Sequence, residues 1–165
     1  MTPVTSAMPV TLVTPVTLVT RAPKRGTDLA MSSLEGVDDP KLEAMIETMF
    51  LAAHADGEFS DEERTHFLAS VESLTDRRLS GDRLTALLAK IEKALDEGGR
   101  EARLAAVKER LPAGKPREIA LSLAIALMAA DGIIRTSERE LILEAAEALE
   151  IDRDRAADMV RDASK

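Results

Sequence analysis

The chain has 165 residues, a formal net charge of −8 and no cysteine, which excludes disulfides, thiol catalysis and zinc–thiolate sites. The negative charge and an aromatic content of only 2% argue against nucleic-acid binding, whereas they are compatible with metal cations or basic partners. With 45% hydrophobic residues, the chain can bury a core, and we expect that core to be aliphatic and helical.

Residues 1–37 have the composition of a low-complexity tail that precedes a helical domain at residues 38–165. The hexapeptide PVTLVT occurs twice in tandem, at residues 9–14 and 15–20, and its prolines interrupt any strand ladder. We therefore expect the tail to be disordered. The alternative is that translation starts near Met31. Because no basic and apolar leader typical of secretion is found, we expect a cytoplasmic protein.

From residue 38 onward, apolar residues recur at helical spacing, which predicts an all-α, compact bundle of about seven helices. The first helix is predicted to begin at Pro40, and the second follows Ser60, which has capping-box spacing to Glu63. A third helix is expected near residues 82–97 and ends at the sequence EGG.

Four further helices are expected after residue 100. The fourth surrounds Leu104 and Leu111, and the fifth contains the apolar run at residues 119–130, which is too short to span a bilayer. The sixth carries residues 141–149, and the seventh begins after Asp152, a predicted N-cap. We therefore expect no membrane insertion.

One helix–turn–helix segment occurs twice, at a shift of 75 residues. The stretch AHADGEFSDEER at residues 53–64 corresponds to MAADGIIRTSER at residues 128–139. The same shift also aligns apolar positions in the flanking helices: Ile46 with Leu121, Phe50 with Ile125, Phe67 with Ile142, and Leu74 with Leu149. This agreement predicts an internally duplicated helical hairpin that packs about a pseudo-twofold axis.

The repeated acidic turn shares part of the spacing of a calcium-binding EF-hand loop. Asp56 and Glu63 would take its fifth and twelfth positions, but the first and third positions are then Ala52 and His54. In the second copy these early positions are Leu127 and Ala129. Since a calcium loop needs oxygen ligands there, an EF-hand is excluded.

Two interpretations of the acidic turns remain open. In the first, glycine ends one helix and the acids cap the next, so that the residues are purely structural. In the second, symmetric packing brings Asp56, Glu63, Asp131 and Glu138 together, and clustered carboxylates then require a positive charge, such as a divalent metal ion. Additional oxygens are available in the first copy only, from Glu58 and Asp61.

The two turns on an acidic helical body resemble the TerB-type tellurite-resistance family, whose fold is shared with the N-terminal domain of DjlA-type co-chaperones. The resemblance covers roughly residues 38–163. It implies a compact helical domain without known catalysis, a stress-response role, and cation binding, with calcium or a similar hard ion, by Asp56, Glu63, Asp131 and Glu138. The sequence departs from the family pattern at Arg135, whose charge offers an internal salt bridge in place of the metal.

Other residues point to weaker possibilities. His54, beside the first turn, is an auxiliary metal ligand or, on the simpler interpretation, a partly exposed residue at a helix end. The basic residues Arg100, Arg103 and Lys108 are expected to form solvated faces.

The leading functional hypothesis is a non-enzymatic TerB-like module that binds a divalent cation or serves as a scaffold in a bacterial stress response. The alternative is a metal-independent adaptor that binds a protein partner, like a co-chaperone's accessory domain. A hydrolytic enzyme is the third class, because paired carboxylates can act as acid and base, but it requires a cleft with a raised carboxyl pKa.

Overall fold

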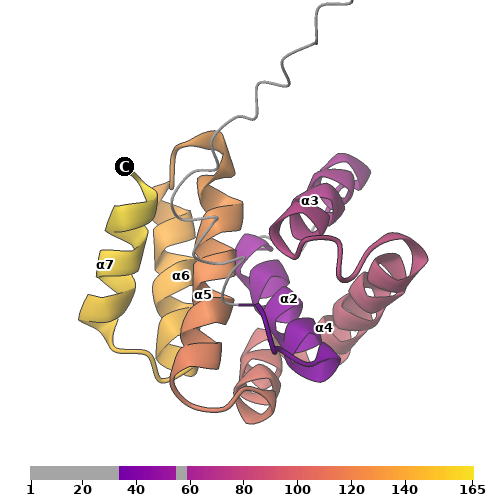
Figure 1. The fold of residues 1–165 in the computed structure, drawn as a ribbon, viewed down its shortest axis with the longest axis horizontal. Helices are drawn as coiled ribbons and strands as arrows, with labels where there is room; N and C mark the ends of the chain where they lie inside the picture. The colour runs from indigo at the N-terminus through magenta and orange to yellow at the C-terminus, as the bar shows by residue number, and fades with distance from the viewer. Residues whose placement is uncertain (1–33, 55–58) are drawn as a thin grey trace, which may run out of the picture.

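A computed structural model describes residues 34–54 and 59–165, and residues 1–33 and 55–58 lie outside this description. The described residues form six α-helices and one 3₁₀ turn, with no strand, which confirms the predicted all-α class (Figure 1). The elements are α2 (Asp39–Ala53), α3 (Asp61–Leu74), α4 (Gly81–Arg110), α5 (Lys115–Met128), η1 (Ala129–Asp131), α6 (Thr136–Ala148) and α7 (Arg153–Ala163).

The predicted count of seven helices is not reproduced, because the expected third and fourth helices are parts of the single element α4. Its interior contains Gly99 with φ 78° and ψ 168°, a backbone conformation that is open essentially only to glycine. The chain resumes helical geometry directly afterwards. Gly99 therefore separates two helical segments that are joined across a kink, at the position where the third helix was predicted to end.

Several predicted helix starts agree with the structure to within a residue. The carboxylate of Asp38 accepts a hydrogen bond from the Lys41 backbone N–H at 3.0 Å, so helix α2 begins at Asp39 with Pro40 in its first turn. Asp152 caps α7 by accepting from the backbone N–H of Arg155 at 3.1 Å. Because such caps act within one turn of chain, local sequence identifies them well.

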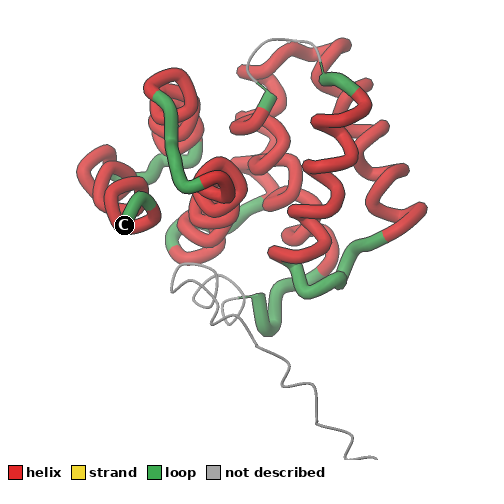
Figure 2. The backbone as a smooth tube through the Cα atoms, turned by 90° about the horizontal axis from the view of Figure 1, so that it is seen from above, coloured by secondary structure: helices red, strands yellow, loops and turns green. Residues whose placement is uncertain are grey.

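Helices α2 and α5 form the centre of the molecule. Almost every residue of α2 from Leu42 to Ala52 is buried, and α5 is buried on most of its circumference between Ala120 and Met128. A helix that is apolar all round needs neighbours on every side. In the ribbon, α2, α3 and α4 lie on one side and α5, α6 and α7 on the other (Figure 1), and the view from above keeps this division (Figure 2).

The helical hairpins α2–α3 and α5–α6 contact each other through several pairs of helices. Helix α2 packs chiefly on α5, and each of these central helices also touches the second helix of the other hairpin, α2 with α6 and α5 with α3. Helix α4 contacts both α2 and α6, and α7 covers α5 and α6. The eight core positions that the 75-residue shift aligns are all buried.

The first described residues, Leu34–Val37, pack onto the helical body. Leu34 is buried, and its carbonyl oxygen accepts a hydrogen bond from Arg78 Nη1 at 3.0 Å. The same guanidinium donates to the Val37 carbonyl at 2.5 Å. The predicted tail before Leu34 lies outside the described residues. In the part of the chain that is described, no helix is both long and apolar enough to cross a bilayer.

Candidate functional site: two acidic turns

The first acidic turn joins α2 to α3, and its structure is described up to His54 and again from Phe59. Ser60 Oγ accepts a hydrogen bond from the Glu63 backbone N–H at 3.2 Å, and Glu63 Oε2 accepts one from the Ser60 N–H at 2.8 Å. This reciprocal pair is the predicted capping box. Glu63 is therefore held at the start of α3 by the backbone of the turn.

These hydrogen bonds also set the ionisation of Glu63. The backbone hydrogen bond from Ser60 lowers the pKa of the Glu63 carboxyl below its usual value of 4.5, the Ser60 hydroxyl lowers it further, and the nearby His54 contributes a smaller attraction. The side chain is exposed. Glu63 is consequently an ionised carboxylate at neutral pH, and at least one of its oxygens is already used as a cap.

The second acidic turn joins α5 to α6 through the 3₁₀ turn η1. Gly132 follows with φ 86°, in the left-handed region, and its N–H donates to the Ala129 carbonyl at 2.8 Å. Glu138 Oε2 then accepts from the Arg135 backbone N–H at 2.7 Å. Glu138 thus repeats the capping bond of Glu63 at the equivalent position, although Arg135 replaces the serine.

The structure describes two of the four predicted ligands in full, Glu63 and Glu138. Asp56 lies outside the described residues, and of Asp131 only the backbone is described. Among the described side chains, no group of three histidine, aspartate or glutamate residues is arranged to hold a metal. The convergence of the four acids therefore remains a prediction. Of the two residues that could supply additional oxygen ligands, Glu58 lies outside the described residues, and Asp61 is an exposed residue at the start of α3.

An aromatic cluster backs the first turn, and sequence analysis did not anticipate it. The His54 ring stacks on Phe50 with centroids 4.9 Å apart, and Phe59 meets His54 edge-on at 5.5 Å. Phe67 completes the cluster at 5.8 Å from Phe50. All three phenylalanines of the chain meet here, and the signal that could have revealed this is their placement on both sides of the turn, at residues 50, 59 and 67. His54 is half-buried at the end of α2, in agreement with the simpler interpretation of this residue.

Two contacts of Arg64 secure the start of α3. Its guanidinium forms a bidentate ion pair with Glu92 on α4, with N–O distances of 2.6 and 2.8 Å, and lies 5.7 Å from the centre of the Phe59 ring. The hydrogen bond to Glu92 raises the pKa of Arg64. The start of α3 is thus fixed to α4 by an ion pair.

The expectation that Arg100, Arg103 and Lys108 form solvated faces was wrong for Arg100 and Arg103, whose side chains are largely buried. Arg103 Nε lies 2.6 Å from Glu47 Oε1, and Arg110 also binds this carboxylate, which is only 1% exposed at the centre of α2. Lys108 pairs with Glu150 at 2.6 Å. Because burial of Glu47 requires compensation of its charge, Arg103 and Arg110 of α4 direct their guanidinium groups toward it.

Arg100 joins the two hairpins. Its Nη1 donates to the Leu51 carbonyl in the last turn of α2, and its Nε lies 3.1 and 3.2 Å from the two carboxylate oxygens of Glu144 on α6. Arg135 behaves differently: no ion pair between its guanidinium and an acid is among the contacts of the described residues, and its backbone N–H donates to Glu138 while its carbonyl accepts from the Arg139 N–H at 2.9 Å. The salt bridge considered for Arg135 is not among the described contacts.

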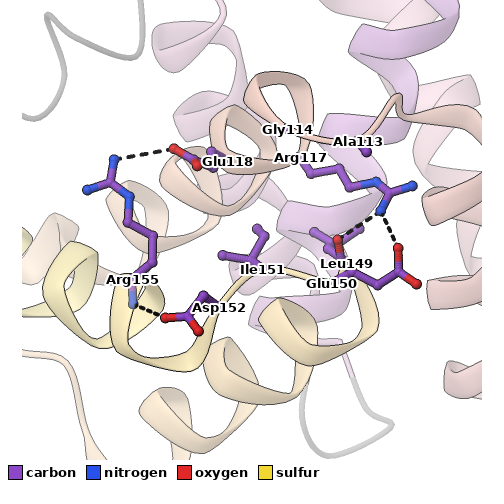
Figure 3. Close-up of a pocket in the computed structure, with 9 residues that line it drawn as sticks. All are labelled: Ala113, Gly114, Arg117, Glu118, Leu149, Glu150, Ile151, Asp152 and Arg155. Carbon is purple, nitrogen blue, oxygen red and sulfur yellow. Dashed lines mark hydrogen bonds and ion pairs between the residues drawn. The ribbon is translucent and has the colours of Figure 1, made fainter.

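A small cavity of about 170 Å³ lies at the other end of the second hairpin, between the loops before α5 and after α6 (Figure 3). Its charged side chains face one another in pairs. Arg117 Nη1 is 2.8 Å from Glu150, and Arg155 Nη2 is 3.3 Å from Glu118. The pocket is therefore separate from the acidic turns, and its charges mainly hold the helix ends together.

The comparisons with known proteins agree with this fold. The family model described as "Tellurite resistance protein TerB" matches residues 42–161, which is most of the chain and includes both acidic turns. The protein belongs to this TerB family. Neither the search of curated proteins nor the search of solved structures finds a match. The family assignment therefore rests on the pattern of the helical body.

Proposed function

We propose that the protein is a non-enzymatic TerB-family module that binds a divalent cation at its two acidic turns and serves as a scaffold in a bacterial stress response. The observation that carries this proposal is the equivalence of Glu63 and Glu138. Each accepts the N-cap N–H of the second helix of its hairpin, at 2.8 and 2.7 Å. Two carboxylates are thereby held at the same position of two similar turns.

The crossed packing of the hairpins supports an internal duplication. If the hairpins α2–α3 and α5–α6 are related by a twofold axis, α2 should pack on α5. Each of these two helices should also contact the second helix of the other hairpin, which is α6 for α2 and α3 for α5. The contacts of α2 with α6 and of α5 with α3 have this pattern. Under this proposal, Asp56 and Asp131 complete the carboxylate set, and the ion is calcium or a similarly hard cation that prefers oxygen ligands.

The direction of the carboxyl pKa shifts supports a binding role over catalysis. A general acid at neutral pH needs a raised carboxyl pKa. The pKa values of Asp38, Glu63, Glu150 and Asp162 are instead lowered, in each case chiefly by hydrogen bonds from the backbone or from basic side chains.

Calcium titration of the full chain, followed by ¹H–¹⁵N NMR, tests the cation proposal. We expect saturable shifts of amides near Glu63 and Glu138, which the double variant Asp56→Asn with Asp131→Asn loses. Asp96→Asn, an exposed residue on α4, removes one similar charge and should leave the response intact. Absence of any response in the parent protein would refute cation binding.

The capping bonds themselves favour one alternative function. Because Glu63 and Glu138 are already engaged by backbone N–H groups, a metal-free protein that uses its acidic or apolar surface to bind a protein partner is the second candidate. Co-purification with one defined partner, unchanged by a chelator and by the double aspartate variant, would support this adaptor. Loss of the partner on chelation would instead favour the cation-dependent module.

A further inference from the structure

Two arginines of α4 share one buried carboxylate. Arg103 Nε lies 2.6 Å from Glu47 Oε1, and Arg110 Nη2 binds the other oxygen, Oε2. The Glu47 side chain is only 2% exposed, whereas the side chains of Arg103 and Arg110 are 24% and 36% exposed. Because both guanidinium groups contact the carboxylate and reach solvent, the two arginines lie between Glu47 and the surface of the protein.

The charges of this cluster do not cancel. One carboxylate faces two guanidinium groups, and the hydrogen bond to Glu47 raises the pKa of Arg103. Both arginines therefore stay protonated under ordinary conditions. Among the described residues, no second acid forms an ion pair with Arg103 or with Arg110. One positive charge thus remains uncompensated at this place, on a chain whose formal net charge is −8.

Several nitrogens of this pair are available to a further ligand. Apart from the bonds to Glu47, the two side chains form one described hydrogen bond, from Arg110 Nε to the Ala106 carbonyl at 3.3 Å. Arg103 Nη1 and Nη2 and Arg110 Nη1 have no hydrogen-bond partner in the described part of the chain. The Arg103 nitrogens are not buried, because Arg100 Nη2 is the only buried side-chain nitrogen without a partner there. A solute can therefore reach them.

Helix α4 places a small residue between the two arginines. Arg103 and Arg110 are two helical turns apart and lie on the same face of the helix. Ala106, on this face, follows Arg103 by three positions and precedes Arg110 by four, and its methyl group leaves space between the longer side chains. Since Glu47 already fixes both guanidinium groups from the buried side, a ligand has less side-chain entropy to overcome.

We propose that Arg103 and Arg110 form a binding site for a phosphate-type oxyanion, the chemical class of inorganic phosphate and phosphate monoesters. A tetrahedral oxyanion has enough oxygens to accept hydrogen bonds from both guanidinium groups, whereas the two oxygens of a carboxylate match only one. The site is formed by α2 and α4 and includes neither acidic turn, so it does not depend on the proposed cation binding.

Titration of the full chain with inorganic phosphate, followed by NMR of the arginine Nε–Hε groups and the backbone amides, tests this site. We expect saturable shifts of Arg103, Arg110 and amides at residues 102–111, which sodium chloride at equal ionic strength does not reproduce. Acetate should bind at least about tenfold more weakly than phosphate. Equal binding of acetate and phosphate, or no saturable response to phosphate, would overturn the proposal.

Glycerol 2-phosphate, a phosphate monoester, distinguishes the two sources of the ligand group. Tighter binding of the ester would identify a phosphorylated molecule as the ligand, and tighter binding of inorganic phosphate would identify the free anion. Equal affinities would support a site that recognises the phosphate group itself.

A charge-neutral substitution locates the site. Arg110→Gln leaves Arg103 to neutralise Glu47 and should weaken phosphate binding at least about tenfold, because it removes a hydrogen bond between charged groups. Arg153→Gln is the matched control. Arg153 is an exposed residue of α7 without an ion pair among the described contacts, and its loss changes the net charge equally. It should keep the Kd within about twofold. Equal weakening by both variants would reveal a general charge effect and overturn the site.

Ala106→Glu separates binding from folding, since Arg110→Gln also removes part of a buried ion-pair cluster. The new carboxylate would lie beside both arginines and would precede Arg110 at the favourable i,i+4 spacing. We therefore expect the melting temperature to be retained and the phosphate response to be lost, with every titration carried out below the melting temperature. Phosphate binding by Ala106→Glu with the affinity of the parent would overturn the proposal.

Discussion

The two hairpins hold equivalent glutamates with different supporting residues. The first turn has an aromatic cluster beneath it, a serine that completes the capping box, and Arg100 at the end of α2. The second has Ile125 and Ile142 at the equivalent buried positions and Arg135 at the N-cap. The shared feature is the bond from the N-cap N–H to glutamate. Both turns form this hydrogen bond although the residues around it differ. The position of the glutamate carboxylate is therefore what the two turns have in common.

The largest expected effect comes from Glu47, whose equivalent in the second hairpin is the half-buried Ser122. Glu47→Gln removes the charge that compensates Arg103 and Arg110, and breaking such a buried ion pair should lower the free energy of unfolding by about 3 kcal/mol. Urea denaturation measures this change. Ser122→Ala is the matched control and should change stability by about 0.5 kcal/mol. Equal effects of both substitutions would show that the ionic centre of the first hairpin contributes no special stability.

Exchanging the core residues tests the aromatic support. Phe50→Ile places the residue of the second hairpin in the first and removes the ring contacts to His54, Phe59 and Phe67. We expect a loss of about 1–3 kcal/mol by thermal or urea unfolding, because volume and ring pairing are lost together. The reverse change, Ile125→Phe, should cost about 1–3 kcal/mol through overpacking. A neutral Phe50→Ile variant would show that aliphatic and aromatic supports are interchangeable.

Substitutions at the two equivalent N-cap residues, Ser60 and Arg135, are expected to change the stability of the protein in opposite directions. Ser60→Ala should destabilise the protein by about 1 kcal/mol, because the Glu63 N–H loses its hydroxyl acceptor. Arg135→Ser should stabilise it by about 0.5 kcal/mol, because serine completes the second capping box around Glu138. Differential scanning calorimetry of both variants checks this. Destabilisation by Arg135→Ser would show that the Arg135 side chain supports the second turn through another contact.

The smallest expected effect is a pH dependence at the first cap. The folded-state pKa of Glu63 is lowered from 4.5, so its contribution to stability is present above the unfolded pKa and is lost as pH falls through the folded value. Between neutral pH and about pH 5, the contribution should be constant. Unfolding free energies of the parent and Glu63→Gln, measured at a series of pH values, should therefore converge on acidification below 4.5. A difference that stays constant down to pH 3 would contradict the assigned cause.

Local sequence predicted the features that depend on one helical turn. The capping box of Ser60 and Glu63, the N-cap Asp152 and the all-α class follow from interactions between residues three or four positions apart. The kink at Gly99 was harder to predict from the sequence, because a glycine pair after a helical segment is compatible both with the end of the helix and with a kink after which the helix continues. Whether helix resumes depends on partners far along the chain, such as Glu47 and Glu144.

The sequence by itself determined the helical class, the repeated acidic turns, the caps and the family pattern, because these arise from short-range periodicity and spacing. Tertiary structure alone decided that α4 turns its arginines toward Glu47, that Phe67 of α3 packs on Phe50, and that Arg100 reaches both Leu51 and Glu144. Those contacts join residues up to 63 positions apart. A basic residue on a helix looks the same in sequence whether it faces water or a buried carboxylate, and only the packing of the helices distinguishes the two.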